Sequence, residues 1–127
     1  MSSLLHLLIK LQCYGCIRRI LYSGKEEERD AAKEEFIDML KVMEEELGDK
    51  PYFGGNNFGF IDVSLLPFYS WFYALEKFGN FSIGAKCPKL IIWAKRCMER
   101  ESVAKSLPDP IMMYYHAFRM RKRFGVD

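Results

Sequence analysis

The segment from Phe58 to Lys77, FGFIDVSLLPFYSWFYALEK, constrains the fold most, because it leaves almost no polar face when wound as a helix. Its apolar positions are Ile61, Val63, Leu65, Leu66, Phe68, Tyr69, Trp71, Phe72, Tyr73 and Leu75. A helix that is apolar all round belongs inside a bundle of other helices. The segment therefore predicts a buried central helix.

The start of this helix carries a capping signal. If Gly59 is the N-cap, Asp62 falls at the third helical position, where its carboxylate accepts the N-cap N–H. Phe58 and Val63 then occupy the two positions of a hydrophobic staple. These four residues form a predicted folding motif. Loss of the Asp62 carboxylate is expected to cost about 1–3 kcal/mol, as lost caps and unsatisfied buried donors do.

Pro67 lies inside the same segment. Proline has no N–H, so the carbonyl of Val63 loses its normal helical donor and a kink is expected. The kink either shapes a cleft or bends the helix around the bundle, and the sequence leaves both readings open.

The rest of the chain is also helical in pattern. Short loops with Gly or Pro separate the periodic segments, and Gly48 and Gly79-Asn80 are typical helix ends. The sequence predicts an all-α bundle of five to six helices in a single domain, residues 1–127. Besides the central helix, the expected helical ranges are 3–22, 25–47, 88–101, 102–107 and 111–123.

Charge is unevenly distributed in this chain, whose net charge is only +2. Residues 26–46 hold ten acidic and three basic residues, and residues 86–123 hold ten basic and three acidic ones. Two solvated helix faces of opposite sign explain this pattern, and attraction of an anionic ligand by the basic half is the alternative. The low net charge argues against nucleic acid or an anionic membrane as a partner.

Localisation signals are lacking. No run of about 18 apolar residues is present, and the first residues have neither the basic start nor the cleavage positions of a signal peptide. We therefore expect a cytosolic protein with reduced thiols.

Cysteine and histidine patterns give little support for catalysis. Cys13 and Cys16 form a C-x-x-C in the middle of a helix, whereas redox pairs of this type lie at a helix N-terminus beside a strand. Zinc would need two more suitably spaced ligands. His6 and His116 have no nucleophile or carboxylate near them in sequence. We expect no catalytic residue, metal or cofactor from these residues alone.

Two runs, KPYFGGNNFGFIDVSLLPFYSWFYALEKFGNFSI and CPKLIIWAKRCMERESVAKSLPDP, closely resemble the C-terminal domain of plant tau-class glutathione S-transferases. The resemblance covers residues 15–127, and residues 1–14 diverge from the family. In that family an N-terminal thioredoxin-like domain binds the co-substrate glutathione and carries a catalytic Ser, and we expect this domain to be missing here. The capping motif matches the family's own folding motif in its central helix.

The resemblance implies a pocket for the hydrophobic second substrate of the detoxifying conjugation. Its expected wall is formed by Arg19, Tyr22, Trp71, His116 and Met120. Tau-class members often have Tyr at the position of Gly15 and aromatic rings where Tyr22 and His116 stand, so the substrate preference is open.

Two functions stay open at this point. The chain is expected to be either the hydrophobic-substrate domain of a transferase, inactive by itself, or a non-catalytic module for ligands or proteins. Expected partners are a hydrophobic small molecule and a second copy or a thioredoxin-like domain.

Overall fold

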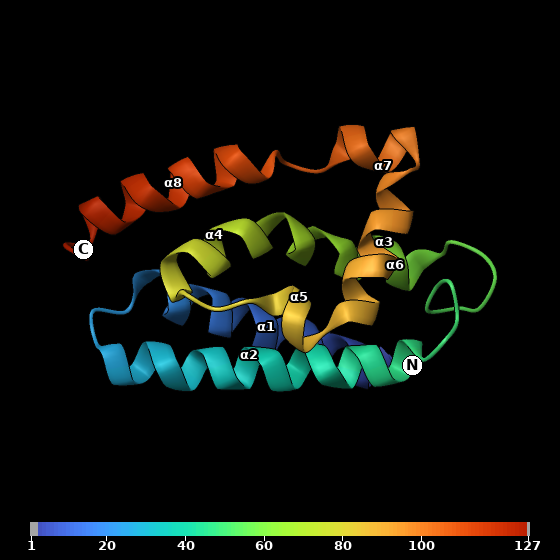
Figure 1. The fold of residues 1–127 in the computed structure, drawn as a ribbon, viewed down its shortest axis with the longest axis horizontal. Coiled ribbons are helices and arrows are strands. Elements are labelled where there is room, and N and C mark those ends of the chain that lie inside the picture. Colours follow the sequence, from blue (N-terminus) through green and yellow to red (C-terminus); the bar gives the residue numbers. More distant parts are fainter. Residues whose placement is uncertain (1–2, 127) are drawn as a thin grey trace.

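The computed structural model describes residues 3–126, and helices form nearly all the regular structure in that range. In chain order the elements are α1 (Ser3–Tyr22), α2 (Glu26–Leu47), α3 (Phe60–Leu65), the 3₁₀ turn η1 (Leu66–Phe68), α4 (Tyr69–Gly79), α5 (Ile83–Lys86), α6 (Pro88–Met98), α7 (Glu101–Ser106) and α8 (Pro110–Arg123) (Figure 1). Within these residues the β-type pairing is a single bridge between Tyr52 and Gly55. The predicted all-α fold is confirmed.

The first two helices form a hairpin. A three-residue link, 23–25, reverses the chain so that α1 packs against α2. The buried side of α2 follows helical spacing, while its acidic residues face outward; the buried residues are Ala32, Phe36, Leu40, Met43 and Leu47. Gly48 ends the helix with a φ of 60°, a conformation that favours glycine. The expected bounds of both helices agree with the structure to within one residue.

The central segment is a broken rod rather than one continuous helix. Pro67 lies in η1, which separates α3 from α4. The missing N–H of proline explains why the α-helical hydrogen bonding changes to a 3₁₀ turn there. The expected interruption of the α-helical hydrogen bonding at Pro67 is therefore present.

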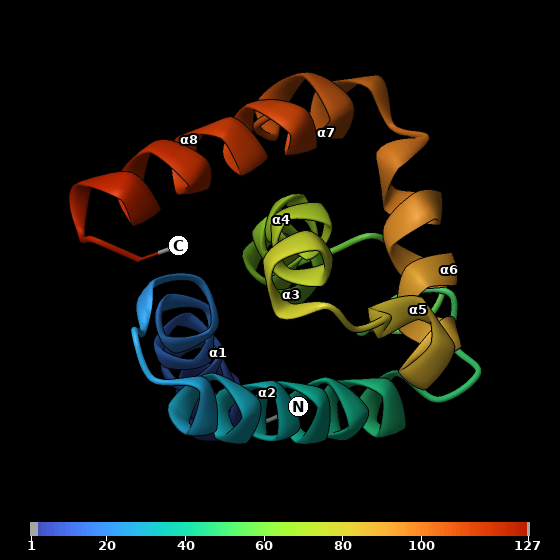
Figure 2. The ribbon, with the colours of Figure 1, turned by 60° about the vertical axis from the view of Figure 1, so that its left-hand side comes forward.

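The prediction that this rod is apolar and buried all round was wrong in part. Val63 is 54% exposed and Tyr73 is 36% exposed, and Phe60, at the first helical position, is 77% exposed. Figure 2 shows other helices around α4, whereas Phe60 and Val63 of α3 are exposed. A sequence pattern reports apolar character, whereas burial depends on which neighbours are present.

Helices from both halves of the chain surround α4. Figure 2 shows α4 enclosed by α1, α2, α6 and α8, and α8 contacts both α4 and α1. The short helix α5 falls in a range expected to be a loop. Its N-cap Ser82 accepts a hydrogen bond from the N–H of Ala85 at 3.3 Å, which supports a single helical turn too short to show periodicity.

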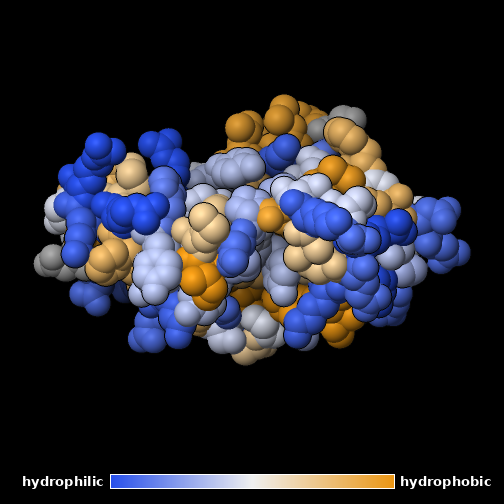
Figure 3. Space-filling view, turned by 90° about the horizontal axis from the view of Figure 1, so that it is seen from above, coloured by the Kyte–Doolittle hydropathy of each residue, from blue (hydrophilic) through white to orange (hydrophobic). Residues whose placement is uncertain are grey.

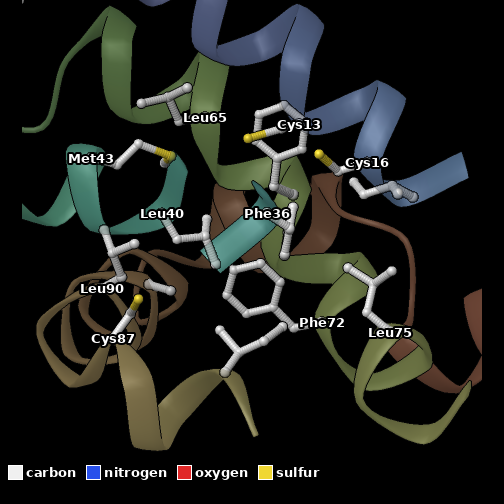
Figure 4. Close-up of a cluster of buried hydrophobic side chains, with 14 of the residues drawn as sticks. Cys13, Cys16, Phe36, Leu40, Met43, Leu65, Phe72, Leu75, Cys87 and Leu90 are labelled. Carbon is white, nitrogen blue, oxygen red and sulfur yellow. The ribbon is translucent and has the colours of Figure 1, made fainter. Parts of the chain in front are cut away.

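A shared core joins the long helices. The rings of Phe36 on α2 and Phe72 on α4 meet edge to face at a centroid distance of 6.1 Å. Leu40, Leu75 and Leu90 bring in side chains from α2, α4 and α6 (Figure 4). This core fixes the ends of α1 and α8, between which the main hollow lies.

One helix face remains uncovered. Leu4, Leu7, Leu8 and Leu11 on α1 are each more than 50% exposed, and their spacing puts them on the side opposite the buried residues of the same helix. We call these four residues the leucine face. Figure 3 shows hydrophobic surface at its upper edge. Among the described helices, none has the combined length and apolarity needed to cross a membrane.

Candidate functional site

A hollow lies between the C-terminal part of α1 and the C-terminal part of α8. Its volume is about 630 Å³, within the range of small-molecule sites. Figure 2 shows the two helix ends lying next to each other. We call it the α1–α8 hollow; its lining residues are Gly15, Arg18, Arg19, Tyr22, Ser23, Glu28, His116, Met120 and Phe124.

Four of the five residues expected to form the pocket wall come together here. Arg19 and Tyr22 lie one turn apart on α1, and His116 and Met120 lie one turn apart on α8. The i, i+3 and i, i+4 spacings put each pair on one helix face. Trp71 does not belong to this lining; it is partly buried and packs against the core.

Charge on the α1 wall is partly neutralised. The Arg19 guanidinium donates a hydrogen bond to Glu35 and lies 3.8 Å from the Glu28 carboxylate. The hydrogen bond to Glu35 raises the pKa of Arg19 above its ordinary value. Arg18 is exposed at the same hollow. The hollow thus combines apolar surface with a cationic side.

Two aromatic rings line the α1–α8 hollow where it meets the end of α8. The Tyr22 ring meets the Phe124 ring edge to face at 5.4 Å. Burial raises the pKa of the Tyr22 hydroxyl, although the nearby Arg121 charge opposes this shift. Tyr22 therefore stays neutral at physiological pH and can donate or accept a hydrogen bond.

Several lining residues were not expected from the sequence. Phe124 follows the last helix directly, and Glu28 lies in the first turn of α2. Each of these two residues lies far along the chain from other residues that line the hollow, so the sequence does not show that they meet. One pattern in the sequence could have indicated Phe124. It lies four residues after Met120, and this spacing continues the same face of α8.

The folding motif surrounds a buried carboxylate. One oxygen of Asp62 accepts the Gly59 N–H at 2.9 Å. The other accepts the Phe53 N–H at 3.0 Å and the Trp93 indole N–H at 2.8 Å. Asp62 has no exposed surface, so all three donors depend on it. Asp62 thus joins the start of α3 to the preceding loop and to α6.

The staple residues of the same motif are placed differently from each other. Phe58 is half-buried, and the Arg100 guanidinium lies 4.6 Å from the centre of its ring. Val63 is mainly exposed, and both residues line a small groove beside α7.

The four cysteines are buried thiols rather than reactive ones. Cys13 and Cys16 lie in the middle of α1, and Figure 4 shows them with Cys87 among apolar side chains. Burial raises the pKa of Cys13 and of Cys97 to about 12, and that of Cys16 and of Cys87 to about 11. Thiolates are therefore disfavoured. Among the described residues, no three His, Cys, Asp or Glu side chains are grouped to hold a metal ion.

These thiols predict a loss of stability at alkaline pH. An unfolded thiol ionises near pH 9.0, whereas the folded thiols resist ionisation up to pH 11–12. Stability is thus full below about pH 9 and falls as the pH rises toward 12, because the unfolded chain releases its protons first. Urea unfolding between pH 7 and 11 measures this decline, and Cys16→Ala should make it shallower. Identical slopes for both proteins would contradict the assignment to Cys16.

Comparison with known proteins gives one consistent result. The family profile described as "Glutathione S-transferase, C-terminal domain" matches residues 5–101. A probable glutathione S-transferase, parC from Nicotiana tabacum, is 58% identical over 118 residues, which is 93% of this chain and 52% of that protein. Glutathione S-transferase U25 from Arabidopsis thaliana is 57% identical over 109 residues, 86% of this chain and 49% of that protein.

The fold comparison agrees. The crystal structure of rice GST1 (OsGSTU1) in complex with glutathione superposes with a TM-score of 0.88 at 37% identity, over 97% of this chain and 55% of that one. The resemblance to the helical half of plant tau-class enzymes is confirmed. The chain spans about half the length of the curated relatives it matches.

Proposed function

Since this chain belongs to the family of glutathione S-transferase C-terminal domains, we propose that the α1–α8 hollow binds the hydrophobic second substrate of a glutathione transferase. The observation that supports this most is the meeting of Arg19 and Tyr22 with His116 and Met120 around one hollow. The family resemblance predicts the same four residues at the substrate wall. A role for Trp71 in that wall stays a prediction.

The proposal assigns binding, not chemistry, to this chain. Conjugation requires a group that lowers the pKa of the glutathione thiol so that a thiolate attacks the electrophile. The described residues offer buried thiols with raised pKa values, and the one that donates to a carboxylate, Cys16 to Glu35 at 3.8 Å, has its pKa raised by burial and by that carboxylate. We propose that these residues, in the cytosol, supply the hydrophobic side of the reaction and are inactive without a glutathione-binding domain.

A second candidate is a protein-interaction module. The leucine face favours it, because four neighbouring leucines exposed on one helix are typical of surfaces that bind another protein. The occupant would be a second copy of this chain or a thioredoxin-like domain.

One ligand titration separates the two candidates. Gly15 lines the hollow, and a Cβ atom built on it meets nothing within 4 Å. A side chain can therefore start at this position without a clash, and the indole of Gly15→Trp should occupy the hollow and weaken binding of the fluorescent probe 8-anilinonaphthalene-1-sulfonate about tenfold. Gly54→Trp, at an exposed loop glycine with equally open space, is the matched control and should leave affinity unchanged.

The leucine face needs its own variant in the same titration. Leu7→Glu combined with Leu11→Glu removes apolar surface without touching the hollow. If this variant no longer binds the probe and the Gly15→Trp protein still binds it, the substrate-site proposal fails and the interaction module is favoured. Sedimentation velocity on the same proteins tests whether the leucine face joins two copies. Glutathione conjugation by the isolated wild-type chain would contradict the assignment of binding without chemistry.

A further inference from the structure

A second hollow lies on another side of the molecule, between α4 and α5. Its volume is about 430 Å³, which is large enough for a small ligand. None of its lining residues belongs to the α1–α8 hollow. We call it the α4–α5 hollow, and the proposed function does not use it.

One face of α4 supplies the main wall. Tyr69, Phe72, Tyr73 and Glu76 follow the spacing i, i+3, i+4, i+7, so their side chains point the same way. The Tyr69 and Phe72 rings meet edge to face at 5.6 Å, and Phe72 is held in turn by Phe36. The aromatic wall is therefore ordered before a ligand arrives, which lowers the entropy cost of binding.

The opposite wall is made of small residues. Gly84 and Ala85 of α5 face the rings, with Ile91 of α6 behind them. The small side chains at these two positions of α5 leave the space open. A flat ligand can then lie against the rings of α4, because aromatic groups prefer offset-stacked or edge-to-face contacts.

The charge in the α4–α5 hollow favours positively charged ligands. Within the described residues that line it, Glu76 is the one charged group. Its carboxylate is held in place by the Ile83 N–H, which donates to Oε2 at 2.8 Å. The Lys77 ammonium lies 5.5 Å from the centre of the Tyr73 ring, so that ring already holds a cation and the ammonium group of a ligand is left to pair with Glu76. The α1–α8 hollow carries more positive charge, because Arg18 and Arg19 line it together with one carboxylate, that of Glu28.

We propose that the α4–α5 hollow binds a planar aromatic molecule carrying a protonated amine, with its ring against Tyr69, Phe72 and Tyr73 and its ammonium group beside Glu76. The two hollows thus sort ligands by charge. Aromatic amines enter the α4–α5 hollow, and aromatic anions enter the α1–α8 hollow.

Two probes with the same ring test this. 1-Naphthylmethylamine is cationic at pH 7 and 1-naphthoate is anionic. In a two-dimensional amide NMR titration of the full chain, the amine should shift the signals of Gly84 and Ala85, and the carboxylate should not. Glu76→Gln keeps an acceptor for the Ile83 N–H but removes the charge, and should weaken amine binding about fivefold, as loss of a solvated ion pair does.

Two further variants complete the experiment. Glu45→Gln changes an exposed carboxylate on α2, away from the hollow, and should leave affinity unchanged. Ala85→Trp fills the hollow and should abolish the shifts, and it decides the question if Glu76→Gln fails to fold by circular dichroism. The proposal is overturned if both probes shift Gly84 and Ala85 equally, if the amine shifts only residues of the α1–α8 hollow, or if amine binding survives Ala85→Trp.

Discussion

Asp62→Ala is expected to lower the free energy of unfolding by about 3–5 kcal/mol, because three donors lose their acceptor at once. The Gly59 N–H, the Phe53 N–H and the Trp93 indole N–H all point to this carboxylate. Asp62 is fully buried, so water cannot replace it without rearrangement. The effect exceeds the 1–3 kcal/mol expected from the cap alone, because two of the donors lie outside the helix.

Urea unfolding followed by circular dichroism measures this loss. Asp62→Asn keeps one acceptor oxygen and should give an intermediate loss, since it also adds a donor. Asp38→Ala removes an exposed carboxylate on α2 and serves as the control, with an expected change within 0.5 kcal/mol. An Asp62→Ala protein as stable as this control would show that the three hydrogen bonds contribute no net stability.

Arg121→Met should lower the free energy of unfolding by about 2–4 kcal/mol, because it removes a buried charge-assisted hydrogen bond. Arg121 is 6% exposed and donates to the carbonyl of Leu21. Leu21 lies in the last turn of α1, where carbonyls have no intrahelical donor and the helix dipole favours a cation. The guanidinium also lies 4.6 Å from the centre of the Phe78 ring on α4.

Methionine retains much of the buried volume of Arg121, so the loss reports on hydrogen bonding and charge more than on packing. Arg119→Met is the matched control, because Arg119 is exposed on the same helix. Amide hydrogen exchange should show the largest change in α8 and in the last turn of α1. Equal free energies of unfolding for the two variants would mean that the guanidinium does not hold the helices together.

Local signals in the sequence predicted the helices well. Gly48 and Asn80 end α2 and α4 with positive φ angles, as their residue types favour. Pro67 marked the break in the central rod. The helix α5 was missed because four residues carry no period, and the exposure of Val63 was missed because burial depends on distant neighbours.

The sites were less predictable from residues alone. The spacing of Asp62 indicated its bond to Gly59, but Phe53 and Trp93 reach it through the tertiary fold. The wall residues of the α1–α8 hollow came from the family resemblance, since nothing in the periodicity of α1 or α8 distinguishes His116 from a surface residue. The α4–α5 hollow gave no sequence signal, because its aromatic rings look like ordinary core residues.

The contact between Arg121 and Leu21 spans 100 positions of sequence. Closing so long a loop costs entropy that contacts within a helix avoid, so we expect this contact to form after the helices themselves. On a ribosome it has to wait until α8 has left the exit tunnel. The α1–α8 hollow shares these two helix ends, so a ligand bound there would recognise finished molecules and would ignore nascent or C-terminally shortened ones.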